Sequence, residues 1–381
     1  MSLVNSDAHR GKNMARIQLT GLLPEEISAL LPKGKEKYRG MQIFRWIHEK
    51  GARSFDEMTN LSKAFREEIK DRFIIGTMKL AETKRSRDGS TDKYLWELAN
   101  GNHIESVIIR DEGRVTACIS SQAGCKMGCG FCRTGEMQFL RNLASGEIID
   151  QLISMRRILQ ACREDITNVV FMGMGEPLDN LDFVLRALTI IIMETGLSIG
   201  QQKITLSTCG IVPGIIRLAI EYRRLGLAIS LNAADEELRN KLMPINRRYP
   251  LKELLDAAHE FTRITRRRIT FEYILMDGVN DSPEDARRLL AIARRIPSKI
   301  NLIGYNEYEG SPFKRPSDRK IEAFQKILFD GNVTALLRKS RGTDILAACG
   351  QLAAKHSAVI AHLDPETSSG CSGLFDRLRV R

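Results

Sequence analysis

The chain has 381 residues, of which 43% are hydrophobic and 28% are charged, a composition that excludes an intrinsically disordered body. Its 58 Lys and Arg residues exceed its 47 Asp and Glu residues, and the net charge is +11. That excess favours a polyanionic partner such as nucleic acid, because basic side chains release counterions from phosphate. A basic enzyme without such a partner is the alternative.

The beginning of the chain is polar, and no run of about 18 apolar residues occurs, so we expect no secretory signal, no membrane contact and a cytoplasmic protein. The eight cysteines should stay reduced in the cytoplasm, which makes structural disulfides a poor explanation for them. Their spacing therefore becomes the useful observation.

The first part of the chain, residues 1–77, is predicted to form a small helical domain that contacts RNA. One apolar, helix-like pattern ends at Gly51, a residue type typical of helix C-termini. Ser62 is a suitable N-cap for a second helix. The apolar face expected for that helix carries Phe65, Ile69 and Phe73. Basic residues between positions 33 and 45 fit an RNA-binding surface and a solvated face equally well.

Residues 78–116 are predicted to form a β-hairpin extension. Their apolar alternation is broken at Asn100-Gly101 and at Glu112-Gly113, two dipeptides typical of tight turns. We therefore expect antiparallel strands on both sides of each turn.

From residue 117 the pattern changes to strands that alternate with amphipathic helices. The expected strands are 117–120, 168–172, 203–207, 227–231, 269–275, 300–304 and 333–338. The expected helices are 145–162, 180–196, 213–224, 251–265, 284–295 and 318–330. This alternation predicts an α/β core with a parallel sheet over residues 117–355, with its chemistry at the C-terminal ends of the strands. A disordered tail, residues 356–381, is expected to follow.

Three cysteines with the spacing C-x3-C-x2-C follow the first expected core strand: Cys125, Cys129 and Cys132. Three thiolates on one tight loop can hold three corners of a 4Fe-4S cubane and leave one iron open to a small molecule. A zinc site with a distant fourth ligand is the alternative, because structural zinc sites use four protein ligands.

This loop resembles the signature of the radical-SAM superfamily, which follows the first strand of a partial TIM barrel. The resemblance implies a partial (β/α)6 barrel, to which the helical domain and the β-hairpin extension are added. It also implies that the open iron binds S-adenosylmethionine, whose reductive cleavage yields a 5′-deoxyadenosyl radical.

A second motif, "FMGMGEP", follows another expected strand, and its glycines allow a backbone to approach a ligand closely. In the family this loop and several strand ends bind S-adenosylmethionine. By position, the resemblance assigns this role to Gly175, Glu176, Ser207, Ser230, Leu231, Asn232 and Asn306. The family usually has His where this chain has Asn232, a change that a backbone contact survives and a side-chain contact need not.

Two isolated cysteines, Cys118 and Cys349, lie outside the cluster loop. By themselves they are typical of small buried side chains. The segment "SRGTDILAACGQL" around Cys349 closely resembles the end of the RlmN and Cfr family of RNA methyltransferases. The likeness continues through "FDEMTNLSK", "HIESV", "LMPIN" and "FEYILMDGVNDS" and covers most of the chain.

The resemblance implies a role for three residues. Cys349 takes a methyl group from one S-adenosylmethionine, and a second S-adenosylmethionine supplies the radical that removes hydrogen from that S-methyl group. The methylene adds to carbon 2 of adenine, which is too electron-poor for ordinary methyl transfer, and Glu105 removes the ring proton. Cys118 then attacks the Cys349 sulfur, which releases the product and leaves a catalytic disulfide.

The family also implies the partners: 23S rRNA, with tRNA beside the anticodon as an open addition, and an electron donor of the flavodoxin or ferredoxin type. The protein itself is expected to be a monomer. Pro177 and "HIESV" favour RlmN-type methylation at carbon 2, while Cfr-type methylation at carbon 8 stays open. A non-catalytic iron–sulfur or zinc RNA-binding protein is the alternative from another class, and Cys118, Cys349 and Glu105 argue against it.

Two loops are candidates for contact with RNA. One, after Asn306, combines Tyr308 and Phe313 with basic residues, and the other, residues 338–341, is basic and precedes Cys349. Aromatic stacking and positive charge suit an extruded base and its phosphates, although a solvated loop is an equal alternative.

Overall fold

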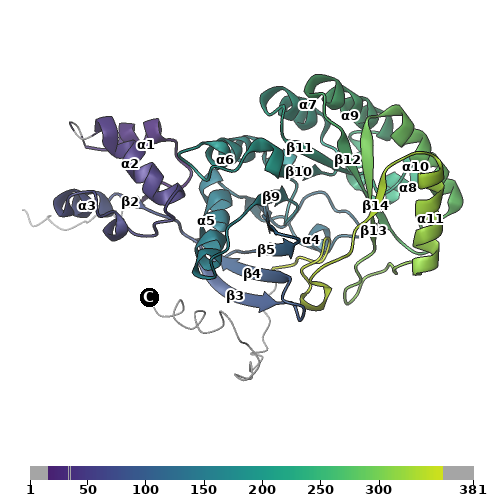
Figure 1. The fold of residues 1–381 in the computed structure, drawn as a ribbon, viewed down its shortest axis with the longest axis horizontal. Helices are drawn as coiled ribbons and strands as arrows, with labels where there is room; N and C mark the ends of the chain where they lie inside the picture. The colour runs from purple at the N-terminus through teal and green to yellow at the C-terminus, as the bar shows by residue number, and fades with distance from the viewer. Residues whose placement is uncertain (1–15, 33, 35, 355–381) are drawn as a thin grey trace, which may run out of the picture.

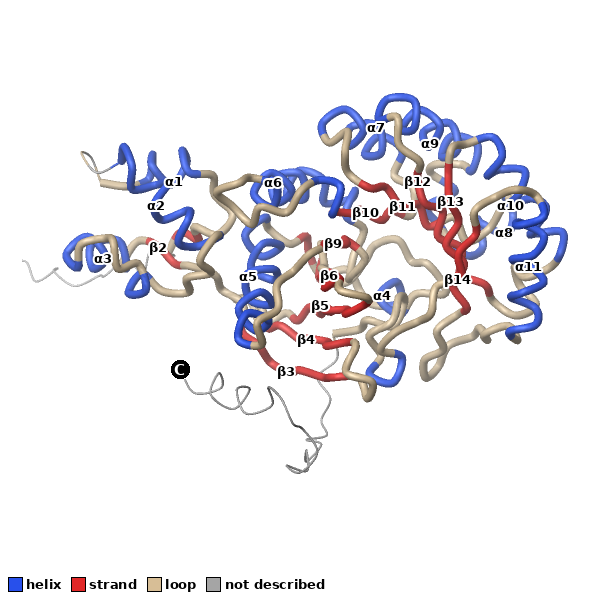
Figure 2. Tube along the Cα trace, viewed as in Figure 1, coloured by secondary structure: helices blue, strands red, loops and turns tan. Residues whose placement is uncertain are grey.

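The computed structural model describes residues 16–32, 34 and 36–354, and one sheet of ten strands dominates it (Figures 1 and 2). The strand order is β14-β13-β12-β11-β10-β9-β6-β5-β4-β3. Seven neighbouring strands run parallel: β6 (Arg114–Cys118), β9 (Asn168–Phe171), β10 (Ile204–Thr208), β11 (Gly226–Ser230), β12 (Ile269–Leu275), β13 (Ser298–Gly304) and β14 (Ala335–Leu337). This is the partial barrel that the alternation of strands and helices predicts.

Helices connect these strands and cover the outer side of the curled sheet (Figure 2). They are α5 (Ser145–Ala161), α6 (Leu181–Ile192), α7 (Val212–Glu221), α9 (Leu251–Thr265), α10 (Pro283–Arg295) and α11 (Asp318–Asp330). Each occurs where the sequence predicts it, although α6 ends before residue 196. Tyr273 of β12 lies 5.5 Å, ring to ring, from Phe324 of α11, one contact of the large apolar core between sheet and helices. Burying such a side chain contributes about 1.5–3 kcal/mol.

Several short elements, all except η3 on the C-terminal side of a strand, were not predicted. They are β7 (Gln122–Ala123), α4 (Arg133–Glu136), β8 (Arg141–Asn142), η2 (Pro177–Asn180), η3 (Gln201–Lys203), α8 (Glu236–Leu242), η4 (Pro244–Arg247) and η5 (Thr343–Ile345). α8 begins because the Asp235 side chain accepts a hydrogen bond from Leu238 N–H at 2.8 Å. These elements surround the cluster loop and the motif loop.

The β-hairpin extension consists of β3 (Lys79–Arg85), β4 (Thr91–Glu97) and β5 (His103–Asp111), antiparallel to one another. β5 also pairs antiparallel with β6 and so joins the extension to the barrel. The predicted turns at Asn100-Gly101 and Glu112-Gly113 are confirmed. A third turn, at Asp88-Gly89, was missed, and Gly89 has a φ of +68° there.

The N-terminal part contains α1 (Pro24–Leu30), α2 (Glu36–His48), η1 (Phe55–Glu57) and α3 (Lys63–Lys70). The Ser62 cap is confirmed, since its Oγ accepts from Phe65 N–H at 3.3 Å. The placement of Phe73 on the same helix is wrong: α3 ends at Lys70, and Phe73 lies in β2 (Phe73–Ile74), which pairs parallel with β1 (Ile17–Gln18).

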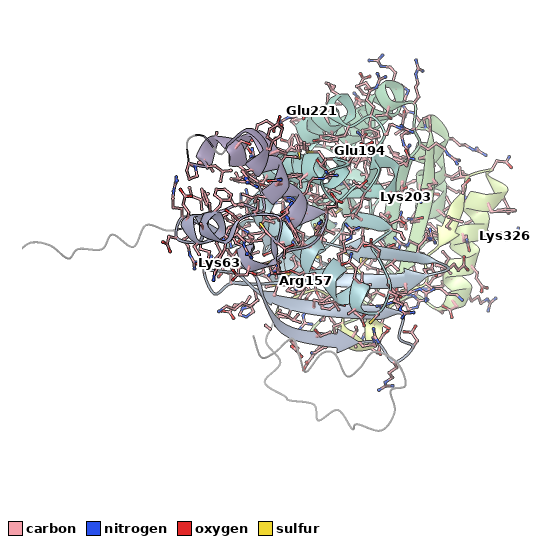
Figure 3. All side chains as sticks on the ribbon, turned by 60° about the vertical axis from the view of Figure 1, so that its left-hand side comes forward. Lys63, Arg157, Glu194, Lys203, Glu221 and Lys326 are labelled. Carbon is pink, nitrogen blue, oxygen red and sulfur yellow. The ribbon has the colours of Figure 1, made fainter. Side chains whose placement is uncertain are left out.

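This part docks on α5 through two arginines. Arg53 forms a salt bridge with the buried Asp150 of α5, and Arg157 of α5 donates to Gly51 O at 3.2 Å. Figure 3 labels Arg157 at this junction and Lys63 on the N-terminal side of it. The N-terminal helices are thereby held against the barrel rather than standing apart.

Buried His48 makes stability in the N-terminal part pH-dependent. Its Nδ1 and Nε2 lie 2.8 Å from Phe44 O and Thr20 O, and burial lowers the pKa of this imidazole. In the unfolded chain the pKa of His48 is near 6.5, so below that pH the unfolded chain binds a proton that the folded protein does not bind. The free energy of unfolding should therefore fall as the pH falls from about 7 to about 5. We expect His48→Gln to flatten this dependence in urea unfolding at the two pH values. If wild type and His48→Gln lost the same free energy of unfolding between the two pH values, His48 would not be the source of the pH dependence.

The C-terminal segment, residues 338–354, crosses from β14 to the other end of the sheet (Figure 1). Leu346 O accepts from Lys93 Nζ of β4 at 3.1 Å, and Gly350 O accepts from Arg133 N–H of α4 at 2.8 Å. The segment therefore closes the gap that the partial barrel leaves. The expected tail, residues 356–381, lies outside the described residues. Across the part of the chain that the structure describes, no helix is both long and apolar enough to span a membrane.

Candidate active site

The cluster loop follows β6 and β7 and is fixed from two sides. Cys132 caps α4, and Gly130 N–H donates to Leu242 O at the end of α8, at 3.1 Å. A Cβ at Gly130 would meet nothing within 4 Å, so one side of the loop is open space. Cys125, Cys129 and Cys132 thus lie on one short loop, with Cys129 buried and the other two half-buried.

The three thiols influence one another electrostatically. Burial raises the pKa of Cys125 to about 12, and it raises that of Cys129 well above the ordinary value, with further rises from neighbouring cysteines. No three His, Cys, Asp or Glu side chains among the described residues converge on a point that one ion could fill. A cubane is larger than one ion and holds each thiolate at a separate iron, so these residues fit a three-cysteine cluster.

The motif loop after β9 is held by Gln122 and by its own carboxylate. Gln122 Oε1 accepts from Glu176 N–H at 2.8 Å, and Glu176 Oε2 accepts from Cys209 N–H at 2.8 Å. Burial raises the pKa of Glu176. Gly175 has a φ of +94°. The Glu176 side chain therefore fixes the loop, which leaves the backbone as the surface that can face a ligand.

Gly175→Ala should disrupt this loop, because a Cβ there would lie 2.4 Å from Gln122 Cβ in a backbone conformation that favours glycine. We expect S-adenosylmethionine binding to weaken by about 5- to 150-fold, as strain of about 1–3 kcal/mol implies. Equilibrium dialysis with the reconstituted protein measures it. Gly200→Ala is the matched control, since its Cβ would meet nothing within 4 Å at a φ of −61°. Equal affinities for both variants would contradict the role of Gly175.

The other residues assigned to S-adenosylmethionine lie at neighbouring strand ends. Ser207 of β10 and Ser230 of β11 are half-buried, and Leu231 is fully buried. Leu231 N–H donates to Glu272 O of β12 at 3.0 Å, and Leu231 O accepts from Arg239 Nε at 3.2 Å. Parallel register brings these ends to one edge, next to the cluster loop, as the sequence predicts.

Asn232 uses its side chain within the protein. Its φ is +57°, a conformation that Asn tolerates, and its Oδ1 accepts from Ile274 N–H at 3.0 Å. Its backbone carbonyl accepts from Asn280 Nδ2 at 2.7 Å. The side-chain oxygen and the carbonyl of Asn232 are thus both engaged within the protein, and a role of Asn232 in binding S-adenosylmethionine stays a prediction.

Cys118 and Cys349 are brought to the same place from distant parts of the sequence. Cys118 ends β6 and is buried, while Cys349 is exposed in the C-terminal segment, where its carbonyl accepts from Asn306 Nδ2 at 3.1 Å. Burial raises the pKa of Cys118 to about 12, and the charge of Cys349 adds to the rise. The positive charge of Arg338 acts to lower the pKa of both thiols. The two thiols therefore lie in the electrostatic neighbourhood of the same arginine.

Glu105 is buried on β5 and contacts the C-terminal segment. Its Oε1 forms a salt bridge with Lys93 Nζ at 3.0 Å, and its Oε2 accepts from Ala353 N–H at 2.9 Å. The carboxylate therefore lies at the site, but with both oxygens engaged. Lys93 is a site residue that the sequence analysis missed.

The aromatic side chains of the loop after Asn306 are less available than predicted. Tyr308 is buried, and its hydroxyl donates to Glu136 Oε1 at 2.7 Å. Phe313 meets the Tyr305 ring edge-on at 5.9 Å. Tyr308 therefore serves packing around the cluster loop and is not a stacking surface for a base in this structure.

Comparisons with known proteins agree with this geometry. Residues 119–290 match the family model of the Radical SAM superfamily, and residues 17–75 match the Ribosomal RNA large subunit methyltransferase N-terminal domain. The crystal structure of a radical SAM methyltransferase from Sphaerobacter thermophilus has a TM-score of 0.86 and 40% sequence identity, over 89% of this chain and 100% of that one. Fold and site thus define a radical-SAM methyltransferase, which uses a 4Fe-4S cluster and S-adenosylmethionine.

Curated relatives specify the substrate class. The dual-specificity RNA methyltransferase RlmN of Pelobacter propionicus is 49% identical over 88% of this chain and 95% of its own length. RlmN of Geobacter sulfurreducens is 48% identical over 90% of this chain and 94% of its own length. RlmN of Desulfosudis oleivorans is 50% identical over 83% of this chain and 85% of its own length. The chain belongs to the RlmN family of RNA methyltransferases, which excludes the non-catalytic alternative.

Proposed function

We propose that this enzyme methylates carbon 2 of an adenosine in 23S rRNA and, as the dual-specificity name of its relatives suggests, an adenosine in tRNA beside the anticodon. The observation that supports the proposal is that the segment bearing Cys349 is held beside the cluster loop, where Arg133 N–H donates to Gly350 O at 2.8 Å, with the Cys118 thiol near enough for the two thiol charges to interact. Binding RNA or S-adenosylmethionine needs neither thiol, whereas a sulfur-bound methyl carrier and its release need both.

Cys125, Cys129 and Cys132 would hold the cluster, and Gly175 and its neighbouring strand ends would hold S-adenosylmethionine. When bound, the two together supply a carbon radical strong enough to remove hydrogen from a methyl group. Two molecules of S-adenosylmethionine are used per turnover, one for the methyl group and one for the radical. A one-electron donor of the flavodoxin or ferredoxin class provides the reducing electron.

Cys349 carries the methyl carbon to the RNA. Its thiolate attacks the methyl carbon of the first S-adenosylmethionine and displaces S-adenosylhomocysteine, and the sulfur then keeps that carbon beside the base while the new carbon–carbon bond forms. Arg338 favours the thiolate, since its positive charge acts to lower the pKa of Cys349. Carbon 2 is electron-poor, so a carbon radical suits it better than direct displacement.

Glu105 is proposed to remove the ring proton. Its carboxylate must first gain a free oxygen, and release of the Ala353 N–H contact at 2.9 Å would free Oε2. Movement of the C-terminal segment therefore prepares the base. Lys93 Nζ binds the other oxygen, Oε1, at 3.0 Å.

Cys118 is proposed to release the product. Its thiolate attacks the Cys349 sulfur, and a sulfur–sulfur bond forms. The electron pair of the broken carbon–sulfur bond goes to the methylene carbon, which takes a proton from water to become the methyl group. The unpaired electron left by the radical addition passes to a one-electron acceptor of the same class as the donor. The disulfide must be reduced before the next turnover, which suits the reducing cytoplasm. A monomer contains all these residues.

Residues 1–77 and 78–116 are proposed to guide RNA to the core, residues 117–355. The similarity of residues 17–75 to a ribosomal RNA methyltransferase N-terminal domain and the net charge of +11 support this.

The direct test is nucleoside mass spectrometry of rRNA and tRNA from a host that lacks adenine methylation at these positions and expresses this chain. The expected product is 2-methyladenosine in both RNAs. Carbon-8 methylation would identify the Cfr-type reaction, and modification of rRNA alone would remove the tRNA half of the proposal.

A further inference from the structure

Arg239 of α8 is completely buried, yet no carboxylate among the described residues lies within salt-bridge distance of it. Its hydrogen bonds end on neutral oxygens: Leu231 O at 3.2 Å, Asn246 Oδ1 at 2.5 Å, Cys209 O at 2.7 Å and Ser230 O at 3.4 Å. A buried guanidinium without a negative partner is costly, because carbonyl dipoles replace only part of its hydration. The arrangement therefore calls for an anion nearby.

The surroundings of Arg239 indicate where that anion forms. Cys209 packs in the same small apolar cluster as Cys129 of the cluster loop. Burial lowers the pKa of the Arg239 guanidinium. The negative charges of Cys209, Cys129 and Glu236 act to raise that pKa, and the two cysteines have larger effects than Glu236. The Glu236 carboxylate is bound elsewhere, by Asn246 Nδ2 at 2.7 Å and Leu251 N–H at 3.0 Å. The three thiols of the loop are the sulfurs that lose protons when iron binds.

We propose that Arg239 is a positioning residue that supplies the fixed positive charge for the iron–sulfur cluster, so that the reduced cluster is stabilised. Three thiolates make the cluster negative, and one added electron makes it more negative. A cation held behind the loop, at a buried position, favours the reduced form more than the oxidised one. This inference concerns the cofactor and does not depend on which RNA or which adenine carbon is the substrate.

Arg239 also clamps the ends of β10 and β11 through the carbonyls of Cys209, Ser230 and Leu231, and the two roles can be separated. A lysine keeps the charge but loses the forked geometry. A glutamine loses the charge and can keep one donated hydrogen bond. Reduction potential should follow the charge, whereas thermal stability should follow the clamp.

The test is an EPR-monitored redox titration of the full chain, reconstituted with iron and sulfide and measured without RNA, for wild type, Arg239→Lys and Arg239→Gln. In Arg239→Gln we expect the equilibrium constant for reduction of the cluster to fall at least tenfold, which lowers the reduction potential by about 59 mV for a one-electron couple. Arg239→Lys should stay within about threefold of wild type. Both variants should lose thermal stability. Iron content and the melting temperature are recorded on the same preparations.

Arg294→Gln is the matched control, because Arg294 also clamps a carbonyl, Gly331 O at 3.1–3.2 Å, but on the outer helices. Its potential should be unchanged. Should Arg239→Gln fail to take up iron while Arg239→Lys takes it up, the charge is again supported. Equal potentials and equal iron contents in the Lys and Gln variants would overturn the proposal and leave Arg239 as a clamp alone.

Discussion

Cys349→Ser should abolish RNA methylation, with a loss of at least about 10³-fold, while reductive cleavage of S-adenosylmethionine continues. A serine hydroxyl stays protonated and cannot take the methyl group, whereas the cluster loop is untouched by this change. The exposed position of Cys349 in the C-terminal segment makes the substitution a mild one for folding. Methyl transfer to RNA is followed with radiolabelled S-adenosylmethionine, and 5′-deoxyadenosine is quantified in the same samples.

Mass spectrometry of the peptide that contains Cys349 provides the second measurement. The wild-type peptide should carry an added methyl group, and the variant should not. Cys209→Ser is a suitable comparison, because Cys209 is a buried cysteine near the cluster loop without a proposed covalent role. Methylated RNA from the Cys349→Ser protein would show that another atom carries the methyl group.

Cys118→Ala should accumulate a covalent protein–RNA complex. Without this thiol nothing attacks the Cys349 sulfur, so the carbon–sulfur bond to the methylated base persists and turnover stops after one cycle. The complex should survive denaturing electrophoresis and disappear after treatment with ribonuclease. Its yield should approach the fraction of protein that carries a methylated Cys349.

Cys209→Ala controls for the loss of a buried sulfur, and it should purify without bound RNA. Both alanines remove a small side chain from the interior, at a cost of roughly 1–2 kcal/mol, so stability alone does not distinguish them. A Cys118→Ala protein that stays free of RNA under conditions where wild type is active would refute the resolving role.

The barrel was predictable because its elements have strong local signals. Helices α9 and α11 have the same bounds as the sequence predicts, residues 251–265 and 318–330, and α11 begins where Ser317 accepts from Lys320 N–H. The pair β1 and β2 was missed because strands of two residues have no periodicity and their pairing is long-range.

Spacing and family likeness identified the cluster cysteines and the two lone cysteines in the sequence. They did not identify the residues that hold the loops and strand ends of the site in place. Gln122, Lys93 and Arg239 hold backbone groups of other elements, contacts that depend on the folded geometry. Nothing in the sequence around Arg239 separates it from the surface arginines of neighbouring helices. Tyr308 was misjudged for the same reason, since its burial against Glu136 requires α4 to lie nearby.

The C-terminal segment has a consequence for the timing of catalysis. The methyl carrier and the wall that closes the barrel are one stretch of chain, fixed by Lys93, Arg133 and Glu105. Each of these hydrogen bonds contributes about 0.5–1.5 kcal/mol, so RNA has to provide binding energy to open it. On the proposed mechanism, the methyl group would be loaded in the closed form and transferred in the open form. Opening of the C-terminal segment can then limit turnover. An RNA that binds the open form more tightly would be methylated faster, although the rate of the bond-forming step itself would not change.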